Sequence, residues 1–131
     1  MFDYIKLFAA TLGLLLLFDS FWIRIVAKDF YAKYLGYLMT TQVNIWPAVI
    51  FYFAYAAGLI YFVIQPALES KSLNQAIFSG AFLGFISYAA YDLTNHATIK
   101  GWYWQMTVVD LMWGTFLSAI VSAIVFKIFY H

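Results

Sequence analysis

The sequence predicts an all-α protein built as a four-helix transmembrane bundle. Apolar residues make up 66% of the 131-residue chain and charged residues 10%, whereas a soluble domain has roughly 45–50% apolar and 25% charged residues. The apolar residues fall into four segments, each about as long as a membrane-spanning helix. One small bundle accounts for the whole length, so we expect a single transmembrane domain over residues 1–131.

The first apolar segment covers residues 4–25, which at about 1.5 Å per residue cross the hydrocarbon core. Lys6 precedes its apolar run as in a signal peptide, but no small-residue cleavage site follows, so we expect a retained helix. The second segment covers residues 44–64. Pro47 is tolerated in its first turn, and we expect Pro66 to end it.

The third apolar segment covers residues 73–94 and begins with a capping box. Ser72 would accept a hydrogen bond from the N–H of Gln75, whose side chain would reach back. The fourth segment covers residues 106–128. An even number of spans places both termini on one side of the membrane.

The connection between the first two spans has apolar residues at every fourth position: Trp22, Val26, Phe30 and Tyr34. This period predicts an amphipathic helix lying in the membrane interface. A helical extension of the first span explains the pattern equally well, so both interpretations stay open.

Tryptophans mark the side of the membrane that carries the first and third loops. Trp22, Trp46, Trp102 and Trp104 are all expected there, as interfacial anchors. The positive-inside rule would place this side in the cytoplasm, but its four Lys and Arg residues against three on the other side do not decide the orientation.

Three aspartates lie near the span ends that face this same side. A carboxylate at bilayer depth costs about 2.5–3.5 kcal/mol on insertion scales, so we expect these groups to pair, hold a proton or bind a ligand. With neighbouring polar residues they form a predicted ligand-binding pocket, whose members are Asp19, Asn44, Tyr88, Asp92, Asn95 and Asp110.

Each aspartate also has a structural interpretation. Thr107 and Asp110 have the spacing of a capping box for the fourth span, and Asp19 could pair with Arg24 or with a backbone amide at the interface. Asp92 is the deepest relative to its neighbours and is the least easily explained as purely structural.

Asp92 and His96 are four residues apart and could form a carboxylate–histidine pair on one helix face. Asp92, His96 and Asp110 are therefore the candidates for acid–base catalysis. The chain has no cysteine and only two histidines, so we predict neither a metal site nor another cofactor. The oxygen-rich cluster would rather suit a proton, a hard cation or an ammonium group.

Small residues predict where the third and fourth spans meet. Gly80 and Gly84 form a G-x-x-x-G pattern, and Gly114, Ser118 and Ser122 continue a row of small residues at every fourth position. Such rows let helix backbones approach closely in a membrane.

Three stretches of the sequence resemble the DUF2177 family of small bacterial integral membrane proteins: Tyr91 to Trp102, Val108 to Gly114, and Phe18 to Trp22. The last is similar to the family's Leu-Asp-x-x-Trp stretch, with Phe18 in place of the leucine. The resemblance covers essentially the full length and implies a four-helix bacterial membrane protein with Asp19, Asp92, Asn95 and Asp110 among the motif positions. It implies no particular reaction or substrate.

The sequence therefore predicts a multi-pass protein of the bacterial inner (cytoplasmic) membrane. We expect an acidic pocket near one surface that binds a small cationic or hydrogen-bonding ligand or a lipid headgroup, for transport or sensing. A membrane-embedded lipid-modifying enzyme with Asp and His acid–base chemistry is the alternative, and a structural or assembly protein the third. The net charge of +1 argues against a nucleic-acid partner. By architecture alone the chain is similar to small multidrug-resistance transporters, whose four helices and weak charge bias permit dimers, but its motifs differ. A homodimer is therefore an expectation from fold-level analogy only.

Overall fold

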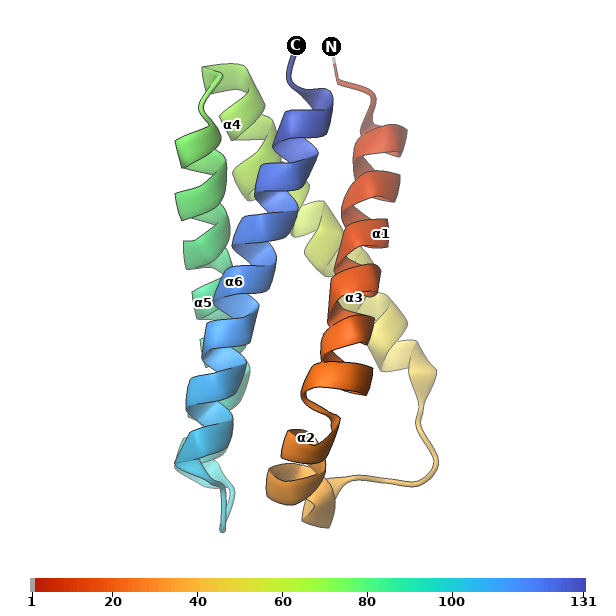
Figure 1. Ribbon diagram of the computed structural model, residues 1–131, viewed down its shortest axis with the longest axis vertical. Coiled ribbons are helices and arrows are strands. Elements are labelled where there is room, and N and C mark those ends of the chain that lie inside the picture. The colour runs from red at the N-terminus through yellow and green to blue at the C-terminus, as the bar shows by residue number, and fades with distance from the viewer. Residues whose placement is uncertain (1) are drawn as a thin grey trace.

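Four helices that are long and apolar enough to cross a membrane form the structure (Figure 1). They cover Tyr4–Val26, Ile45–Ser70, Leu73–Thr98 and Trp104–Phe129. The structure is a computed structural model and describes residues 2–131. Every regular element within these residues is helical, so the predicted all-α class and the four spans are confirmed.

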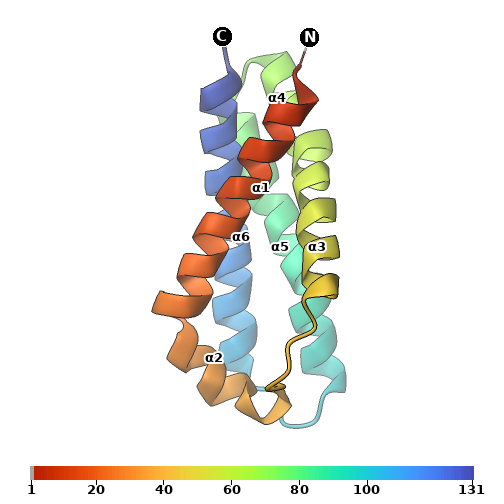
Figure 2. The same cartoon turned by 90° about the vertical axis from the view of Figure 1, so that its right-hand side faces the viewer.

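The two chain termini lie at one end of the bundle in both views (Figures 1 and 2). The short helix α2 (Lys28–Leu35) and the connection between the last two helices lie at the opposite end. We call this opposite end the loop end of the bundle. The even number of spans predicted this arrangement.

The first span bends sharply before α2 begins. Helix α1 (Tyr4–Phe21) continues through a π-helical turn over Trp22–Val26 and stops at Ala27, which is buried and has φ −111° and ψ 9°. Helix α2 follows as a separate element across the loop end (Figure 2). It therefore does not extend the first span as one straight helix, and its contact with the membrane interface stays a prediction.

The second span consists of three consecutive helical segments. They are α3 (Ile45–Leu59), a π-helical turn (Ile60–Ile64) and α4 (Gln65–Ser70). The span ends at Lys71, whose φ of 57° lies in the left-handed region that closes many helices.

Pro66 lies inside the second span, so the predicted helix end before it is wrong. A proline has no N–H, and its ring displaces the carbonyl four residues earlier. The π-helical turn immediately before Pro66 has a longer hydrogen-bond spacing, with the N–H of Gln65 bonded to the carbonyl of Ile60. This wider turn accommodates the proline, and the helix continues to Ser70.

The last two spans are single helices, α5 (Leu73–Thr98) and α6 (Trp104–Phe129), and α5 extends one turn beyond its predicted end. Ser72 caps α5 by accepting from the N–H of Gln75 at 3.1 Å, as predicted. The Gln75 side chain instead accepts from the Ser70 hydroxyl. One half of the capping box is therefore present.

Helices α5 and α6 make the most extensive contact in the bundle. A Cβ atom placed on Gly84 would lie 2.3 Å from the carbonyl oxygen of Gly114, and one on Gly80 would lie 2.7 Å from the Ser122 hydroxyl oxygen. The backbones approach so closely only because these positions carry no side chain. The predicted packing of small residues is confirmed.

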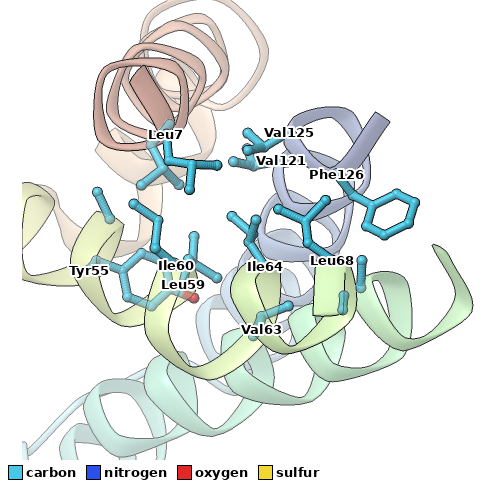
Figure 3. Close-up of a cluster of buried hydrophobic side chains, with 14 of the residues drawn as sticks. Leu7, Tyr55, Leu59, Ile60, Val63, Ile64, Leu68, Val121, Val125 and Phe126 are labelled. Atoms are coloured by element: carbon cyan, nitrogen blue, oxygen red, sulfur yellow. The ribbon is translucent and has the colours of Figure 1, made fainter. Parts of the chain in front are cut away.

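The apolar core occupies the half of the bundle nearer the termini (Figure 3). Side chains from four spans meet there, among them Leu7, Leu59, Ile64, Val121, Val125 and Phe126. The buried aspartates lie toward the other half, so one half of the bundle has a largely apolar core and the other contains the buried carboxylates.

Candidate functional site

Three buried aspartates lie on three different helices in the half of the bundle toward the loop end. Asp19 in α1, Asp92 in α5 and Asp110 in α6 have exposed fractions of 6%, 0% and 7%. The sole ion pair within residues 2–131 joins Lys6 and Asp3, at the other end. No ion pair therefore stabilises the buried carboxylates within these residues, although an unpaired charge is costly at this depth.

Asp19 accepts hydrogen bonds from two other helices. The hydroxyl of Tyr52 in α3 donates to one carboxylate oxygen, and the indole N–H of Trp113 in α6 donates to the other at 2.9 Å. Arg24 is exposed and forms no ion pair in the described part of the chain. The predicted Asp19–Arg24 pair is therefore wrong.

Asp110 is held by a side chain from the short helix α2. The hydroxyl of Tyr31 donates to it at 2.9 Å and accepts in turn from the indole N–H of Trp22 at 2.8 Å. Burial, together with the negative charge of Asp110, raises the pKa of Tyr31 above the usual tyrosine value. Tyr31 therefore stays a neutral donor and fastens α2 to α6.

Trp22 and Trp113 connect these two arrangements. Their rings stack with centroids 4.4 Å apart and an interplanar angle of 5°. Because each indole N–H already has an acceptor, both rings are fixed in plane as well as in position. The Asp19 and Asp110 sites thus share one rigid aromatic wall.

Asp92 differs from the other two aspartates because it has no donor. Both carboxylate oxygens are fully buried and accept no hydrogen bond from the described residues. The carboxyl group of Asp110 is close enough to interact with Asp92 electrostatically and through a shared proton. Two ionised carboxylates can only accept hydrogen bonds, so neither can satisfy the other without a proton.

Two pockets lie beside Asp110. The first, of about 260 Å³, is lined by both Asp19 and Asp110 and by the aromatic side chains of Tyr31, Tyr88 and Trp113, among others. The second, of about 310 Å³, is lined by Phe51 and Ser87 and shares Tyr88, Tyr91 and Asp110 with the first. We call the first the acidic pocket.

Thr107 lies inside α6 rather than at its start. The helix begins at Trp104, and the Thr107 hydroxyl accepts from the indole N–H of Trp102 at 3.0 Å. The same hydroxyl pairs with Nδ1 of His96 at 3.1 Å. The predicted Thr107–Asp110 capping box is therefore wrong, and His96 is bonded to Thr107 instead of Asp92.

The remaining predicted pocket residues are placed differently from one another. Tyr88 lines both pockets, and Asn95 is half-buried one turn beyond Asp92. Asn44 is exposed and accepts from the backbone N–H of Trp46 at 3.2 Å, which makes it the cap of α3. The structure thus brings Tyr88 beside the aspartates and leaves Asn44 outside.

The buried carboxylates do not converge as a set of metal ligands. Within residues 2–131, no group of three His, Cys, Asp or Glu side chains is arranged to hold a metal ion. The acidic pocket is instead lined by two aspartates and by the aromatic side chains of tyrosines and Trp113. This combination attracts organic cations.

Four aromatic residues of the two aspartate sites were not predicted as hydrogen-bonding partners: Trp22, Tyr31, Tyr52 and Trp113. The sequence predicts Trp22 as an interfacial anchor, a member of the four-residue apolar period and part of the family stretch. One signal for the two tryptophans was present, because Asp-x-x-Trp occurs at Asp19–Trp22 and again at Asp110–Trp113. No comparable spacing marks the two tyrosines, which come from other elements.

Comparison with known proteins agrees with the architecture. A family model described as a predicted membrane protein (DUF2177) matches residues 4–127, nearly the whole chain. No curated protein and no solved structure is significantly similar to it. The chain therefore belongs to the DUF2177 family of predicted membrane proteins.

Proposed function

We propose that the protein binds a small organic cation with an ammonium group in the acidic pocket, for transport or sensing. The observation that carries this proposal is the lining of the pocket, where Asp19 and Asp110 both face the same space and no Lys, Arg or His among the described residues does. An ammonium group would neutralise that excess of negative charge.

The aromatic lining supports the same ligand class. Tyr31, Tyr88, Tyr91 and Trp113 surround the pocket, and the faces of such rings attract a desolvated cation within about 6 Å by up to about 2 kcal/mol each. The hydroxyl of Tyr31 and the indole N–H of Trp113 are already donated to the two carboxylates. The ring faces and the remaining carboxylate lone pairs are the features left for a ligand.

The size of the pocket favours a small group. Its volume of about 260 Å³ lies below the range of about 300–1,000 Å³ that is usual for drug-sized ligands. A tetraalkylammonium ion, a free amino alcohol or the amino-alcohol headgroup of a phospholipid has the required charge and scale. The shared chemistry is the ammonium group, whether its source is soluble or the membrane itself.

The setting that we propose is the bacterial inner membrane. A multi-pass membrane protein of this architecture, placed in the bacterial inner membrane, would present the acidic pocket near one surface of the bilayer. The lipid-modifying alternative uses Asp92 or Asp110 as general base and His96 as acid, and His96 bonds to Thr107. No contact of the described residues favours it over ligand binding.

Fluorescence titration would test the proposal, because Trp113 lines the pocket. Purified protein in detergent micelles is titrated with choline and with the uncharged analogue in which carbon replaces the quaternary nitrogen. We expect saturable quenching by choline and none by the analogue. Equal responses to both compounds would show that the pocket does not recognise charge and would overturn the proposal.

Matched variants locate the binding to the pocket. Asp19→Asn and Asp110→Asn should each weaken choline binding at least tenfold, about 1.4 kcal/mol, because each removes one carboxylate from the lining. Asp29→Asn changes an exposed aspartate of α2 that does not line the pocket, and it should bind like the wild type. If Asp29→Asn weakened binding as much as Asp110→Asn, the site would lie elsewhere.

The lipid composition of the membrane distinguishes a soluble ligand from a lipid headgroup. Protein in nanodiscs made with phosphatidylethanolamine should show a reduced apparent affinity for choline compared with nanodiscs of phosphatidylglycerol, if the headgroup competes for the site. Equal affinity in both membranes would assign the site to a soluble cation.

A further inference from the structure

Asp92 is a buried acid that the proposed ligand site does not use. It has no exposed surface, and neither of its carboxylate oxygens receives a hydrogen bond from the described residues. It does not line the acidic pocket, although Asp110 does. A carboxylate with no donor and no water contact is the least stable form of this side chain in a membrane.

The surroundings of Asp92 contain acids and phenols. Asp110 on α6 is close enough to interact with Asp92, and no ion pair involves Asp92 among the described residues. His96 lies one turn further along α5, is exposed and is bonded to Thr107. The titratable groups that line the acidic pocket beside Asp110 are Asp19 on α1, Tyr31 on α2, and Tyr88 and Tyr91 on α5. These acids and phenols carry negative charge when they ionise, so they cannot compensate an ionised Asp92.

A proton between the carboxyl groups of Asp92 and Asp110 would both reduce their mutual repulsion and supply the missing hydrogen-bond donor. It removes one of two adjacent negative charges, and it gives Asp92 the donor that the surrounding residues lack. Asp110 keeps its hydrogen bond from Tyr31 in either case. Asp19, in contrast to Asp92, accepts hydrogen bonds from two donors of its own.

We infer that Asp92 and Asp110 share one exchangeable proton in the empty protein, and that a cation bound in the acidic pocket displaces it. The displacing cation in this inference rests on the proposed function, whereas the shared proton does not depend on it. A cation beside Asp110 supplies the positive charge that the proton supplied before. The proton leaves to a base in the solvent, so the net charge of the site is unchanged and both carboxyl groups are ionised in the complex.

The first test needs no ligand. Infrared spectroscopy of the wild-type protein at neutral pH should show the C=O stretching band of a protonated carboxyl group, with the small shift in deuterated water that an exchangeable proton produces. The band should be absent from Asp92→Asn and retained in the control Asp29→Asn. Absence of the band from the wild type would overturn the inference whether or not the protein binds cations.

The second test measures the proton that binding releases. Choline is titrated into wild-type protein in a weakly buffered solution with a pH indicator, and we expect about one proton released for each cation bound. The affinity for choline should rise by about tenfold for each unit by which the pH increases, over the range in which the pair holds its proton. Binding without proton release would overturn the coupling and leave the proposed ligand site standing.

Variant proteins separate the two roles of the pair. Asp92→Asn should release no proton and should lose the pH dependence of any binding it retains. If Asp92→Asn does not fold, the two wild-type measurements decide the question by themselves. If choline does not bind at all, the proposed function fails, whereas the protonated-carboxyl band still decides whether the pair holds a proton.

Discussion

Trp22 and Trp113 each support the aspartate on the other's helix rather than the aspartate three residues before them. Trp22 follows Asp19 by three residues in the first span, yet its N–H reaches the Tyr31 hydroxyl that bonds Asp110. Trp113 follows Asp110 by three residues, yet its N–H bonds Asp19. With the two rings stacked at 4.4 Å, the crossing ties α1, α2 and α6 together around the acidic pocket.

The crossed arrangement predicts that Trp113→Phe destabilises the protein although it preserves an aromatic ring for stacking. The change leaves Asp19 with Tyr52 as its remaining donor and should lower the free energy of unfolding by about 1–2 kcal/mol. Thermal unfolding in detergent, followed by circular dichroism, would measure it. Trp104→Phe is the control, because Trp104 is 61% exposed and makes no side-chain hydrogen bond with the described residues. Equal stability of the two variants would show that the indole N–H of Trp113 does not contribute to the free energy of unfolding.

The contact between α5 and α6 predicts opposite results for two glycine substitutions. Gly84→Ala would place a methyl group 2.3 Å from the backbone oxygen of Gly114. Because a backbone atom cannot rotate away, we expect a loss of about 1–3 kcal/mol in unfolding free energy. Gly13→Ala in α1 meets nothing within 4 Å, and alanine favours a helix over glycine by about 1 kcal/mol. A Gly84→Ala protein as stable as the wild type would show that the helices separate easily.

Two serines on the same helix should respond differently to removal of their hydroxyls. The Ser118 hydroxyl bonds the Tyr55 hydroxyl, so Ser118→Ala would remove a hydrogen bond from a buried phenol at a cost of about 1–2 kcal/mol. The Ser122 hydroxyl is buried without a partner among the described residues, so Ser122→Ala should be neutral or stabilising. Chemical unfolding of both variants would compare them. A larger loss for Ser122→Ala would indicate an unseen partner at that hydroxyl.

The fold was predictable because a membrane-spanning helix is encoded by a continuous local run of apolar residues. Long apolar runs required helices, and the rows at Gly80 and Gly84 and at Ser118 and Ser122 indicated which two would pack closely. The exception, Pro66, shows the limit of a local rule. A π-helical turn formed by the preceding residues removes the conflict that normally ends a helix at proline.

The candidate site was predictable only in part. The three aspartates stood out because a carboxylate in an apolar run is rare, but their partners depend on tertiary placement. Tyr31 reaches Asp110, 79 residues away, only because the chain turns at Ala27 and returns beneath the bundle. Likewise, the Thr107 spacing indicated a helix cap, yet α6 begins one turn earlier. Local spacing cannot reveal contacts that the turn and the bundle create.

The arrangement of the termini predicts a simple labelling pattern. The chain contains no cysteine, so single cysteines can replace Lys6, Lys33, Lys71 and Lys100 in turn without background. A membrane-impermeant thiol reagent should label positions 6 and 71 from one side of the membrane and positions 33 and 100 from the other. Labelling of 6 and 71 from opposite sides, in vesicles of a single protein orientation, would contradict the topology.

The Tyr31–Asp110 hydrogen bond predicts how stability changes at alkaline pH. Burial and the charge of Asp110 raise the pKa of Tyr31 in the folded protein, whereas an unfolded tyrosine has a pKa of about 10. Below that pH the phenol is neutral in both states and stability does not depend on its titration. Above it the unfolded state loses a proton that the folded state keeps, so the free energy of unfolding falls by up to about 1.4 kcal/mol per pH unit.

Tyr31→Phe should remove this alkaline contribution while lowering stability at neutral pH, because the hydrogen bond to Asp110 is lost. The informative quantity is therefore the slope of unfolding free energy against pH, measured from neutral pH to about one unit above the ordinary tyrosine pKa of about 10. Tyr4→Phe serves as the control, since Tyr4 is 53% exposed and should leave the slope unchanged. Parallel curves for the wild type and Tyr31→Phe would mean that Tyr31 titrates normally in the folded protein. That result would contradict the packing of α2 against the acidic pocket, because a phenol that donates a hydrogen bond to Asp110 does not ionise as readily as one in water.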